Sequence, residues 1–458
     1  MAGILLETDE RIIGIEINLR NNKPKSMNKP NIAPADGKLG VLIPGLGAVS
    51  TTYIAGILNS RKRKVPLFGS VAELAHIRLG HRTEHRQPLI RELVPLAAMS
   101  DLEFGAWDLF PDNAYEAAKT AGVLKPEDLE PIRSEMEAIK PWTGAFDRDY
   151  VKKLEGVHIK RGNRRAMANE IMEDIKRFKQ AKNCARLVMV WCGSTEVYHE
   201  PEDVHNSLEA FEKGLDNDDH RISPSMLYAY AALKLGIPYA NGAPHMNCEI
   251  PALRTLADQT DAPMTGKDFK TGQTLLKTII APGLKARMIG VRGWFSTNIL
   301  GNRDGEVLDD PGSFRSKEVT KGSVLDTIFQ SDLYPDLYGD LYHKIRINYY
   351  PPRGDEKEAW DNIDLVGWLG YPMQLKINFL CRDSILAAPV VHDLALFLDL
   401  SKRAGLKGVQ EWLGFYLKAP LTIDKLPPEH DLFIQQLKFK NTLRQLAGEE
   451  PITHLEDR

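Results

Sequence analysis

VLIPGLGAVSTTYIAG, residues 41–56, sets the architecture of this chain. A short apolar run meets glycines at once, and the apolar residues from Tyr53 to Leu58 follow at helical spacing. Strand, tight turn and helix in this order open a βαβ unit. The turn from Gly45 to Ser50 lacks the third glycine of a GxGxxG motif. By itself the turn is as typical of ordinary strand-to-helix geometry as of nucleotide binding.

Elements of the same kind continue along the chain. Strand-like runs at Leu102–Trp107 and Leu187–Trp191 alternate with helical patterns over 114–121, 163–178 and 224–235. Such alternation predicts a parallel sheet with helices on both faces.

A different pattern follows Thr274. KIRINYY at 344–350 and QLKINFL at 374–380 alternate apolar and polar residues, as strands with one buried and one wetter face do. These strands predict a second domain of the α+β class. From Ser384 the chain is helical again, and a last helix is expected near Asp431 to Leu446.

The composition is that of a globular protein. With 458 residues, of which 43% are hydrophobic, the chain can bury a large core. Lys and Arg number 59 against 62 Asp and Glu, and a formal charge of -3 predicts neither a nucleic-acid partner nor a membrane surface. Four dispersed cysteines without a CxxC pair indicate buried thiols in a reducing compartment. With acids near the N-terminus and no run of about 18 apolar residues, we expect a soluble, cytoplasmic protein.

Two further turns follow predicted strands, where ligands bind in doubly wound sheets. Asp108 follows the first strand, and its carboxylate could accept hydrogen bonds from ribose hydroxyls. The turn from Cys192 to Thr195 follows the second. Both turns favour dinucleotide binding.

An anion-binding segment is the next candidate. In DFKTGQT, residues 268–274, we expect a helix to start near Gly272, so that free N–H groups and the hydroxyls of Thr271 and Thr274 could hold a phosphate. Without context, an ordinary capped helix, in which Thr271 satisfies its own first turn, is the more common arrangement.

Lysines are the candidate catalytic groups. Lys317 and Lys321 would project from one helix face, which for an isolated pair is usually a solvated surface. Other short polar motifs supply Asp304, Lys357, Asp383 and Lys418. Crowded ammonium groups lower one another's pKa, so one lysine could act as a base near neutral pH while others stabilise an oxyanion. The sequence has neither HExxH nor GxSxG, which leaves zinc hydrolysis and serine-nucleophile chemistry without support. For His245 we expect a loop or structural role.

Together these motifs resemble one known family, myo-inositol-1-phosphate synthase, also called inositol-3-phosphate synthase, from about Leu39 to about Leu446. The segments that carry the resemblance stand in the family's order and approximate spacing: GLGAVSTTYIAG, GAWDLFPDNAYEAA, VWCGSTEVY, NGAP, GKDFKTGQT, LGNRDG, FRSKEVTK, GDEK, CRDSILAAP and LKAPL. Chance agreement of so many segments is implausible.

The resemblance implies an activity and an architecture. The activity is the NAD-dependent conversion of D-glucose 6-phosphate to 1D-myo-inositol 3-phosphate by oxidation at C5, enolisation at C6, intramolecular aldol closure on C1 and re-reduction. The architecture is a discontinuous Rossmann-like NAD domain with a second α+β catalytic and oligomerisation domain, in a homotetramer. The implied ranges are 1–38 for an N-terminal segment and linker, 39–274 and 387–458 for the NAD domain with the C-terminal tail, and 275–386 for the second domain.

The resemblance also assigns roles to residues. The implied catalytic residues are Lys317, Lys321, Lys357, Lys418, Asp268, Asp304 and Asp383. The implied cofactor-binding residues are Gly45, Gly47, Ala48, Val49, Ser50, Asp108, Cys192, Gly193, Ser194, Thr195, Gly242, Asp268, Thr271, Asn302, Arg303, Asp304, Lys317, Asp355 and Asp383. The implied phosphate-binding residues are Thr271, Gly272, Gln273, Thr274, Lys321 and Lys357. We hypothesise that Lys317 and Lys418 lie at the reacting carbons, while Lys321 and Lys357 hold the phosphate with backbone amides.

Four motifs depart from those of better-known eukaryotic members, which have GDD, GNND, GDSK and CED where this chain has GKD, GNRD, GDEK and CRD. Lys267, Arg303 and Arg382 thereby add positive charge around the expected site. A metal requirement stays open. Two alternative activities also stay open: cyclisation of another phosphosugar, and an ordinary NAD-dependent dehydrogenase that releases an oxidised sugar phosphate. A non-enzymatic scaffold is disfavoured because the lysines and aspartates all remain.

Overall fold

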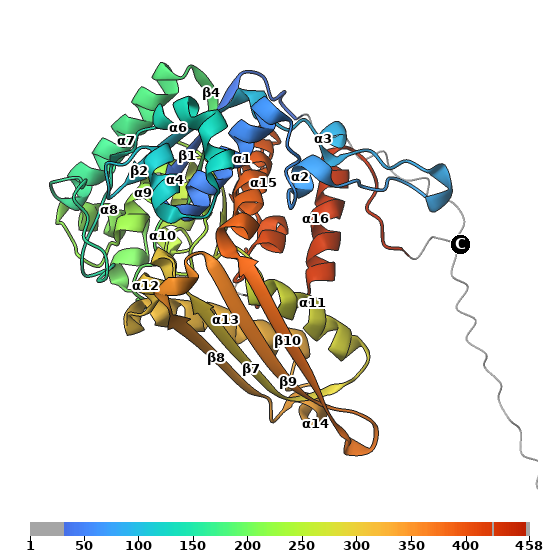
Figure 1. The fold of residues 1–458 in the computed structure, drawn as a ribbon. Coiled ribbons are helices and arrows are strands. Elements are labelled where there is room, and N and C mark those ends of the chain that lie inside the picture. The colour runs from blue at the N-terminus through green and yellow to red at the C-terminus, as the bar shows by residue number, and fades with distance from the viewer. Residues whose placement is uncertain (1–31, 424–425, 455–458) are drawn as a thin grey trace, which may run out of the picture.

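The structure, a computed structural model, describes residues 32–423 and 426–454, without the side chains of 318–323. The apolar opening at Ile12–Ile17 and most of the predicted linker Arg20–Lys38 lie outside the described residues. Two units stand out in Figure 1: a larger sheet with helices on both faces, and a smaller sheet that extends from it.

Seven parallel strands form the larger sheet, in the order β11-β6-β5-β4-β1-β2-β3. They are β1 (Lys38–Pro44), β2 (Leu102–Asp108), β3 (Trp142–Thr143), β4 (Cys184–Trp191), β5 (Tyr239–Asn241), β6 (Pro263–Gly266) and β11 (Gly408–Val409). Since β1 pairs with β2 on one side and β4 on the other, the strand order reverses beside β1. In such sheets the ligand crevice opens at the carboxyl ends of the strands that flank this reversal.

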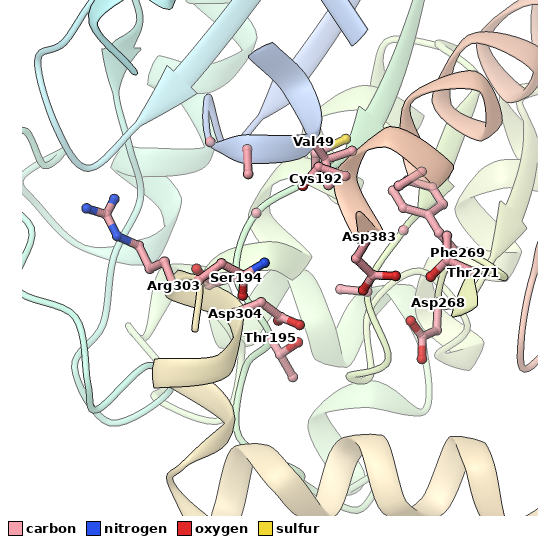
Figure 2. Close-up of a pocket in the computed structure, with 18 of the residues that line it drawn as sticks. Val49, Cys192, Ser194, Thr195, Asp268, Phe269, Thr271, Arg303, Asp304 and Asp383 are labelled. Carbon is pink, nitrogen blue, oxygen red and sulfur yellow. The ribbon is translucent and has the colours of Figure 1, made fainter. Parts of the chain in front are cut away.

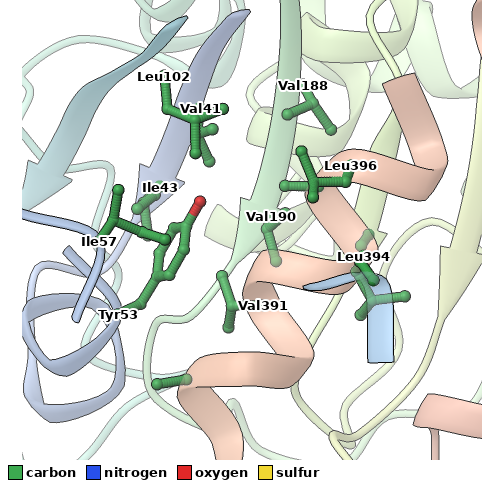
Figure 3. Close-up of a cluster of buried hydrophobic side chains, with 14 of the residues drawn as sticks. Val41, Ile43, Tyr53, Ile57, Leu102, Val188, Val190, Val391, Leu394 and Leu396 are labelled. Atoms are coloured by element: carbon green, nitrogen blue, oxygen red, sulfur yellow. The ribbon is translucent and has the colours of Figure 1, made fainter. Parts of the chain in front are cut away.

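Alternate residues of the central strands face two separate cores. Val41 and Ile43 of β1 pack with helices α1, α4, α15 and α16, while Leu42 faces helices α7, α8, α9 and α10. Figure 3 shows the first core, in which Tyr53 of α1 and Leu394 of α15 flank β1 and β4. The covering helices are α1 (Ala48–Arg63), α4 (Ala114–Ala121), α7 (Arg164–Ala181), α8 (Leu208–Asp216), α9 (Pro224–Lys234), α10 (Pro251–Gln259), α15 (Asp383–Arg403) and α16 (Leu432–Leu446). Shorter helices in the connections are α2 (Val71–Leu74), α3 (Ile90–Leu93), α5 (Pro126–Leu129) and α6 (Arg133–Glu137).

The smaller sheet is mixed and has the strand order β10-β9-β7-β8. Its strands are β7 (Gly290–Leu300), β8 (Tyr342–Tyr349), β9 (Glu356–Val366) and β10 (Pro372–Arg382). Helices α11 (Gly272–Ala286) and α13 (Pro311–Phe329) cover one face and bury Trp294 and Phe329. The other face carries exposed apolar side chains, among them Phe295 and Trp360. Helices α12 (Arg303–Leu308) and α14 (Pro335–Tyr338) complete this unit.

Helix α15 connects the two units. It begins directly after β10 and runs back into the core beside β1 and β4. It is long and apolar enough to span a membrane by length and composition, but 83% of its most apolar window is buried inside the molecule, which is typical of a core helix. The predicted Rossmann-like fold with a second sheet is therefore confirmed.

Candidate active site

A cleft opens at the carboxyl ends of β1 and β4, bordered by α12 and α13 of the smaller unit. The cleft has two adjoining hollows, and the first has a volume of about 880 Å³, including the space at its opening to solvent. A second hollow, of about 710 Å³, continues past Asp108 and Phe110. The residues that line both hollows are Gly47, Cys192, Gly193, Ser194 and Arg303.

Most of the predicted site residues line this cleft. Those in the first hollow are Gly47, Ala48, Val49, Cys192, Gly193, Ser194, Thr195, Gly242, Asp268, Thr271, Asn302, Arg303, Asp304, Lys317, Asp383 and Lys418, and Gly45 and Asp108 line the second. The other predicted residues with described side chains are buried and do not line either hollow: Ser50, Gly272, Gln273, Thr274, Asp355 and Lys357. Lys321 is in α13, and its side chain lies outside the described residues. Figure 2 shows Asp268, Asp304 and Asp383 pointing into one space from different elements.

The glycine turn is shaped to admit a dinucleotide. Gly45 has φ +93°, and a Cβ there would lie 2.4 Å from the Cα of Gly193, so only glycine fits between these loops. A Cβ on Gly47 would meet nothing within 4 Å, because this residue faces the open cleft at the N-terminus of α1. The buried hydroxyl of Ser50 donates to the Gly45 carbonyl and thus holds the turn. Backbone N–H groups without a capping side chain at a helix N-terminus can bind a pyrophosphate. The glycine turn and the start of α1 therefore suit the predicted cofactor, NAD.

Asp108 ends β2 at the second hollow. Its Oδ2 accepts the Leu46 N–H at 2.6 Å and its Oδ1 accepts the Phe110 N–H at 3.0 Å. Burial raises the pKa of Asp108, and these backbone hydrogen bonds oppose the rise. The carboxylate therefore fixes the glycine turn, and its remaining lone pairs can accept ribose hydroxyls.

Two lysines from distant segments converge on one carboxylate oxygen. Lys317 of α13 lies 3.3 Å from Asp268 Oδ1, and Lys418 lies 3.0 Å from the same atom. Burial lowers the pKa of Lys317, but the carboxylates of Asp268 and Asp304 outweigh burial, so its pKa is raised. Burial also lowers the pKa of Lys418, and there the opposing effect of Asp268 is too weak to restore it. The pair is thus polarised: Lys317 keeps its proton while Lys418 loses its proton more readily.

The N-terminus of α11 forms the predicted anion-binding segment. In the described part of the chain, the Thr271 side chain makes no capping hydrogen bond, so the ordinary capped helix is excluded and the first-turn amides stay available. A Cβ built on Gly272 would lie 3.9 Å from Lys357 Nζ and 3.7 Å from Asp383 Oδ1. Lys357 Nζ donates to Asp383 Oδ2 at 3.2 Å. Burial lowers the pKa of Lys357, but Asp383 outweighs burial and keeps the ammonium charged.

The Gln273 side chain serves the fold. Its Oε1 accepts from Asn298 at 2.5 Å, and its Nε2 donates to the carbonyl of Trp360 at 3.0 Å. Only the backbone amide of Gln273 remains for an anion.

Asp355 joins two elements beside the cleft. Its Oδ1 accepts from Asn302 Nδ2 at 3.0 Å and from Ser384 Oγ at 2.8 Å. It therefore ties the start of α12 to the start of α15. Ser384 itself lines the cleft, as do Ala243, Phe269 and Ala387, which the residue-by-residue assignment missed although each lies within or beside a quoted motif.

Glu196 and His245 form a buried pair behind the turn that follows β4. The Glu196 N–H donates to His245 Nδ1 at 3.1 Å, and burial lowers the pKa of His245 to about 3. A neutral imidazole that accepts a backbone hydrogen bond has the structural role expected for this residue. Burial raises the pKa of Glu196, which lines the second hollow, to about 7. Glu196 lies in the quoted motif VWCGSTEVY, but no local pattern marked it as buried, and it was assigned no role.

The charges added by the departing motifs behave differently from one another. Lys267 pairs with Glu249 at 2.6 Å. Arg382 pairs with Glu356, its register partner across β10 and β9, at 2.9 Å, so two of the departures compensate each other. Arg303 instead stacks on Phe110 at the cleft.

Among the residues that the structure describes, no group of three or more His, Cys, Asp or Glu is placed to hold a metal ion. The four cysteines are free thiols; three are buried, and Cys192 is partly exposed at the cleft.

Fold and site define a class of protein: a dinucleotide-dependent enzyme with a lysine-rich cleft for an anionic substrate. Comparison with known proteins makes the assignment specific. The sequence profile of the myo-inositol-1-phosphate synthase family matches residues 39–444. The chain is 54% identical to inositol-3-phosphate synthase 1 of Bacteroides thetaiotaomicron over 430 residues, 93% of this chain and 100% of that protein. It is 32% identical to inositol-3-phosphate synthase 1 of Oryza sativa subsp. japonica over 448 residues, 90% of this chain and 87% of that protein.

Structural similarity agrees with the sequence matches. The crystal structure of inositol-3-phosphate synthase from Caenorhabditis elegans superposes with a TM-score of 0.86 at 27% identity, covering 93% of this chain and 88% of that one. The chain belongs to the myo-inositol-1-phosphate synthase family, which confirms the resemblance seen in the sequence.

Proposed function

We propose that this chain is an isomerase that converts D-glucose 6-phosphate to 1D-myo-inositol 3-phosphate with bound NAD and without net redox change. One observation carries the proposal. Lys317 and Lys418 converge on Asp268 in a cleft that also offers a glycine turn for a dinucleotide and an uncapped helix N-terminus for a phosphate. The family to which the chain belongs is named for this activity.

The chemistry that bound NAD would supply is reversible hydride transfer at C5 of the sugar. The amides at the start of α1 and the turn from Gly45 to Val49 would hold its pyrophosphate, and Asp108 its ribose. Asp383 lies in the same cleft, and its Oδ1 has no hydrogen-bond partner within the described residues. A buried acceptor of this kind calls for a donor on a bound ligand.

The two lysines on Asp268 would divide acid and base roles. Enolisation removes a proton from C6, and Lys418, whose pKa is lowered, is suited to accept it. Lys317 stays protonated and can donate a hydrogen bond to the oxygen that becomes negative. In the aldol step the same ammonium groups can stabilise or protonate the developing alkoxide. Asp268 holds both amines in place.

The start of α11 would bind the phosphate of the substrate. The free backbone N–H groups of its first turn and the Lys357 ammonium lie close together, and both would attract a phosphate. Lys321, one helical turn after Lys317, is proposed to join them, on the basis of the family motif FRSKEVTK.

Product analysis tests this function. Purified protein with glucose 6-phosphate and catalytic NAD is expected to yield inositol phosphate with no accumulation of NADH. NADH in proportion to consumed sugar would instead favour the dehydrogenase. Turnover of a different hexose phosphate with none of glucose 6-phosphate would favour a cyclase for another phosphosugar.

The lowered pKa of Lys418 predicts a pH dependence. A lysine acts as a base only when neutral, so kcat should rise with pH as Lys418 deprotonates, below the usual lysine range, while Lys317 stays charged. Initial rates measured from about pH 6 to about pH 9 at saturating substrate would show this rising limb. A kcat that falls steadily over this interval would exclude Lys418 as the base.

We further propose that the open face of the smaller sheet mediates assembly into a homotetramer. Phe295 and Trp360 are 41% and 40% exposed on adjacent strands, and clustered exposed aromatic side chains are typical of a protein interface. Trp360→Glu is expected to shift light-scattering masses toward smaller species, while Val157→Glu, at an exposed residue of the larger unit, should not. An unchanged mass for Trp360→Glu would place the interface elsewhere.

A further inference from the structure

Arg303 stands where the two hollows of the cleft join. It is the first residue of α12, it is exposed, and it lines both hollows. Its guanidinium carbon lies 4.4 Å from the centroid of the Phe110 ring, which serves as a platform. Within the described part of the chain its guanidinium makes no hydrogen bond or ion pair, so its five N–H donors are available to a ligand. Figure 2 shows the side chain extended from α12, on the side of the cleft away from Asp268 and Asp383.

Within the described part of the chain, Arg303 is the one charged residue that lines both hollows, since Lys317 and Lys418 line only the first. The other residues that line both hollows are Gly47, Cys192, Gly193 and Ser194, all of them uncharged. The start of α1 contributes amides and a partial positive charge of about one half, but no cationic side chain. A pyrophosphate bridging the two hollows would carry two negative charges.

Arg303 is held in place by its helix. Val307 of α12 packs with Tyr150, Val151 and Leu154 of the larger unit. Asn302 caps α12 by accepting the Gly305 N–H at 3.1 Å and is itself bonded to Asp355. The smaller unit therefore holds Arg303 in place, without a ligand, at the part of the cleft where the glycine turn would bind the dinucleotide.

We propose that Arg303, stacked on Phe110, clamps the pyrophosphate of the dinucleotide against the N-terminus of α1. The clamp rests on the proposed NAD dependence and goes beyond it, because it makes cofactor affinity depend on one side chain of the smaller unit. Unlike Lys267 and Arg382, Arg303 forms no ion pair within the described residues, although its charge lowers the pKa of Asp108. The clamp explains this, because the ligand supplies the partner.

Calorimetric titration with three ligands tests the clamp. NAD and ADP-ribose contain the pyrophosphate, and adenosine lacks it. Arg303→Asn is expected to lower the affinity for NAD and for ADP-ribose by about tenfold, which corresponds to the loss of one charge-assisted hydrogen bond. The affinity for adenosine should stay within about twofold of the wild-type value. Arg303→Lys should recover part of the loss, because it keeps the charge. Raising NaCl from about 50 to about 500 mM should weaken NAD binding to the wild type more than to Arg303→Asn.

A matched control is available in Arg315. It is also exposed and stacks on an aromatic ring, with its guanidinium carbon 5.0 Å from the Tyr198 centroid. Arg315→Asn should bind all three ligands like the wild type.

Three results would overturn the clamp. Unchanged affinity of Arg303→Asn for ADP-ribose would show that Arg303 leaves the pyrophosphate untouched. If Arg303→Asn lost as much affinity for adenosine as for NAD, Arg303 would contact the adenosine part of the ligand or would only shape the hollow. If Arg303→Lys recovered none of the affinity for NAD, the charge of Arg303 would be excluded as the cause. Failure of the wild type itself to bind NAD is a separate outcome, which would overturn the proposed cofactor along with the clamp.

Discussion

Lys418→Ala is expected to lower kcat by about 1,000-fold, within the range for loss of an acid–base group, while the fold remains intact. The Lys418 side chain is only 5% exposed, and its ammonium lies 3.0 Å from Asp268. Truncation removes the group with the lowered pKa from the cleft. Asp268 keeps the ion pair with Lys317, so its buried carboxylate is not left uncompensated. The loss should therefore appear in catalysis and not in folding.

Inositol phosphate formation at saturating substrate measures this effect, and thermal unfolding with NAD titration measures the integrity of the fold and cofactor site. Lys407→Ala is the matched control, because Lys407 is 57% exposed and pairs with Asp261 at the surface. Near-normal product formation by Lys418→Ala would remove Lys418 from the chemistry. A collapsed melting temperature would show that this lysine holds the core.

Gly45→Ala is expected to destabilise the protein by about 2–5 kcal/mol and to abolish NAD binding. Two effects add. The residue has φ +93°, where an L side chain is strained, and the new Cβ would lie 2.4 Å from the Cα and 2.6 Å from the amide nitrogen of Gly193. Those neighbours are backbone atoms at the end of β4, so relief requires the two loops to separate. The amides at the start of α1 would then lose their position. Urea denaturation monitored by fluorescence measures the first effect, and calorimetry with NAD measures the second.

Gly47→Ala, two residues on, separates the two effects. Its φ is -98°, and its Cβ would meet nothing within 4 Å. Stability should therefore stay within about 1 kcal/mol of the wild type. Affinity for NAD should still fall, because the methyl group occupies the space in which the backbone approaches the pyrophosphate. A Gly45→Ala variant as stable as Gly47→Ala would contradict the close contact between the two glycine loops.

Local sequence patterns were sufficient for the elements that they predicted, although they left several strands and helices unassigned. The expected helix at 114–121 is α4 residue for residue, and the strand expected at Leu102–Trp107 is β2, one residue longer. The helix expected near Gly272 begins there, QLKINFL lies in β10, and KIRINYY lies in β8 except for Tyr350. These predictions succeed because hydrophobic period and turn residues act over a few neighbouring positions.

The roles of individual polar side chains could not be read from those patterns. Ser50 and Gln273 belong to site motifs, yet the first holds the glycine turn and the second bonds to strands of the smaller sheet. Arg382 and Glu356 looked like two separate departures and turn out to be a cross-strand pair. The bonds of Gln273 and Arg382 join residues whose pairing depends on the register of distant segments, and the bond of Ser50 depends on the conformation of the glycine turn.

The chain's periodicities and glycine turns thus specify a parallel sheet, its binding turns and the short motifs that carry lysines and aspartates. The convergence of those motifs arises only on folding: Lys317 and Lys418 meet Asp268 across 49 and 150 residues of chain. Their opposite pKa shifts arise there as well. Burial and the number of nearby carboxylates set those shifts, and both are properties of the packed molecule that no local run of residues contains.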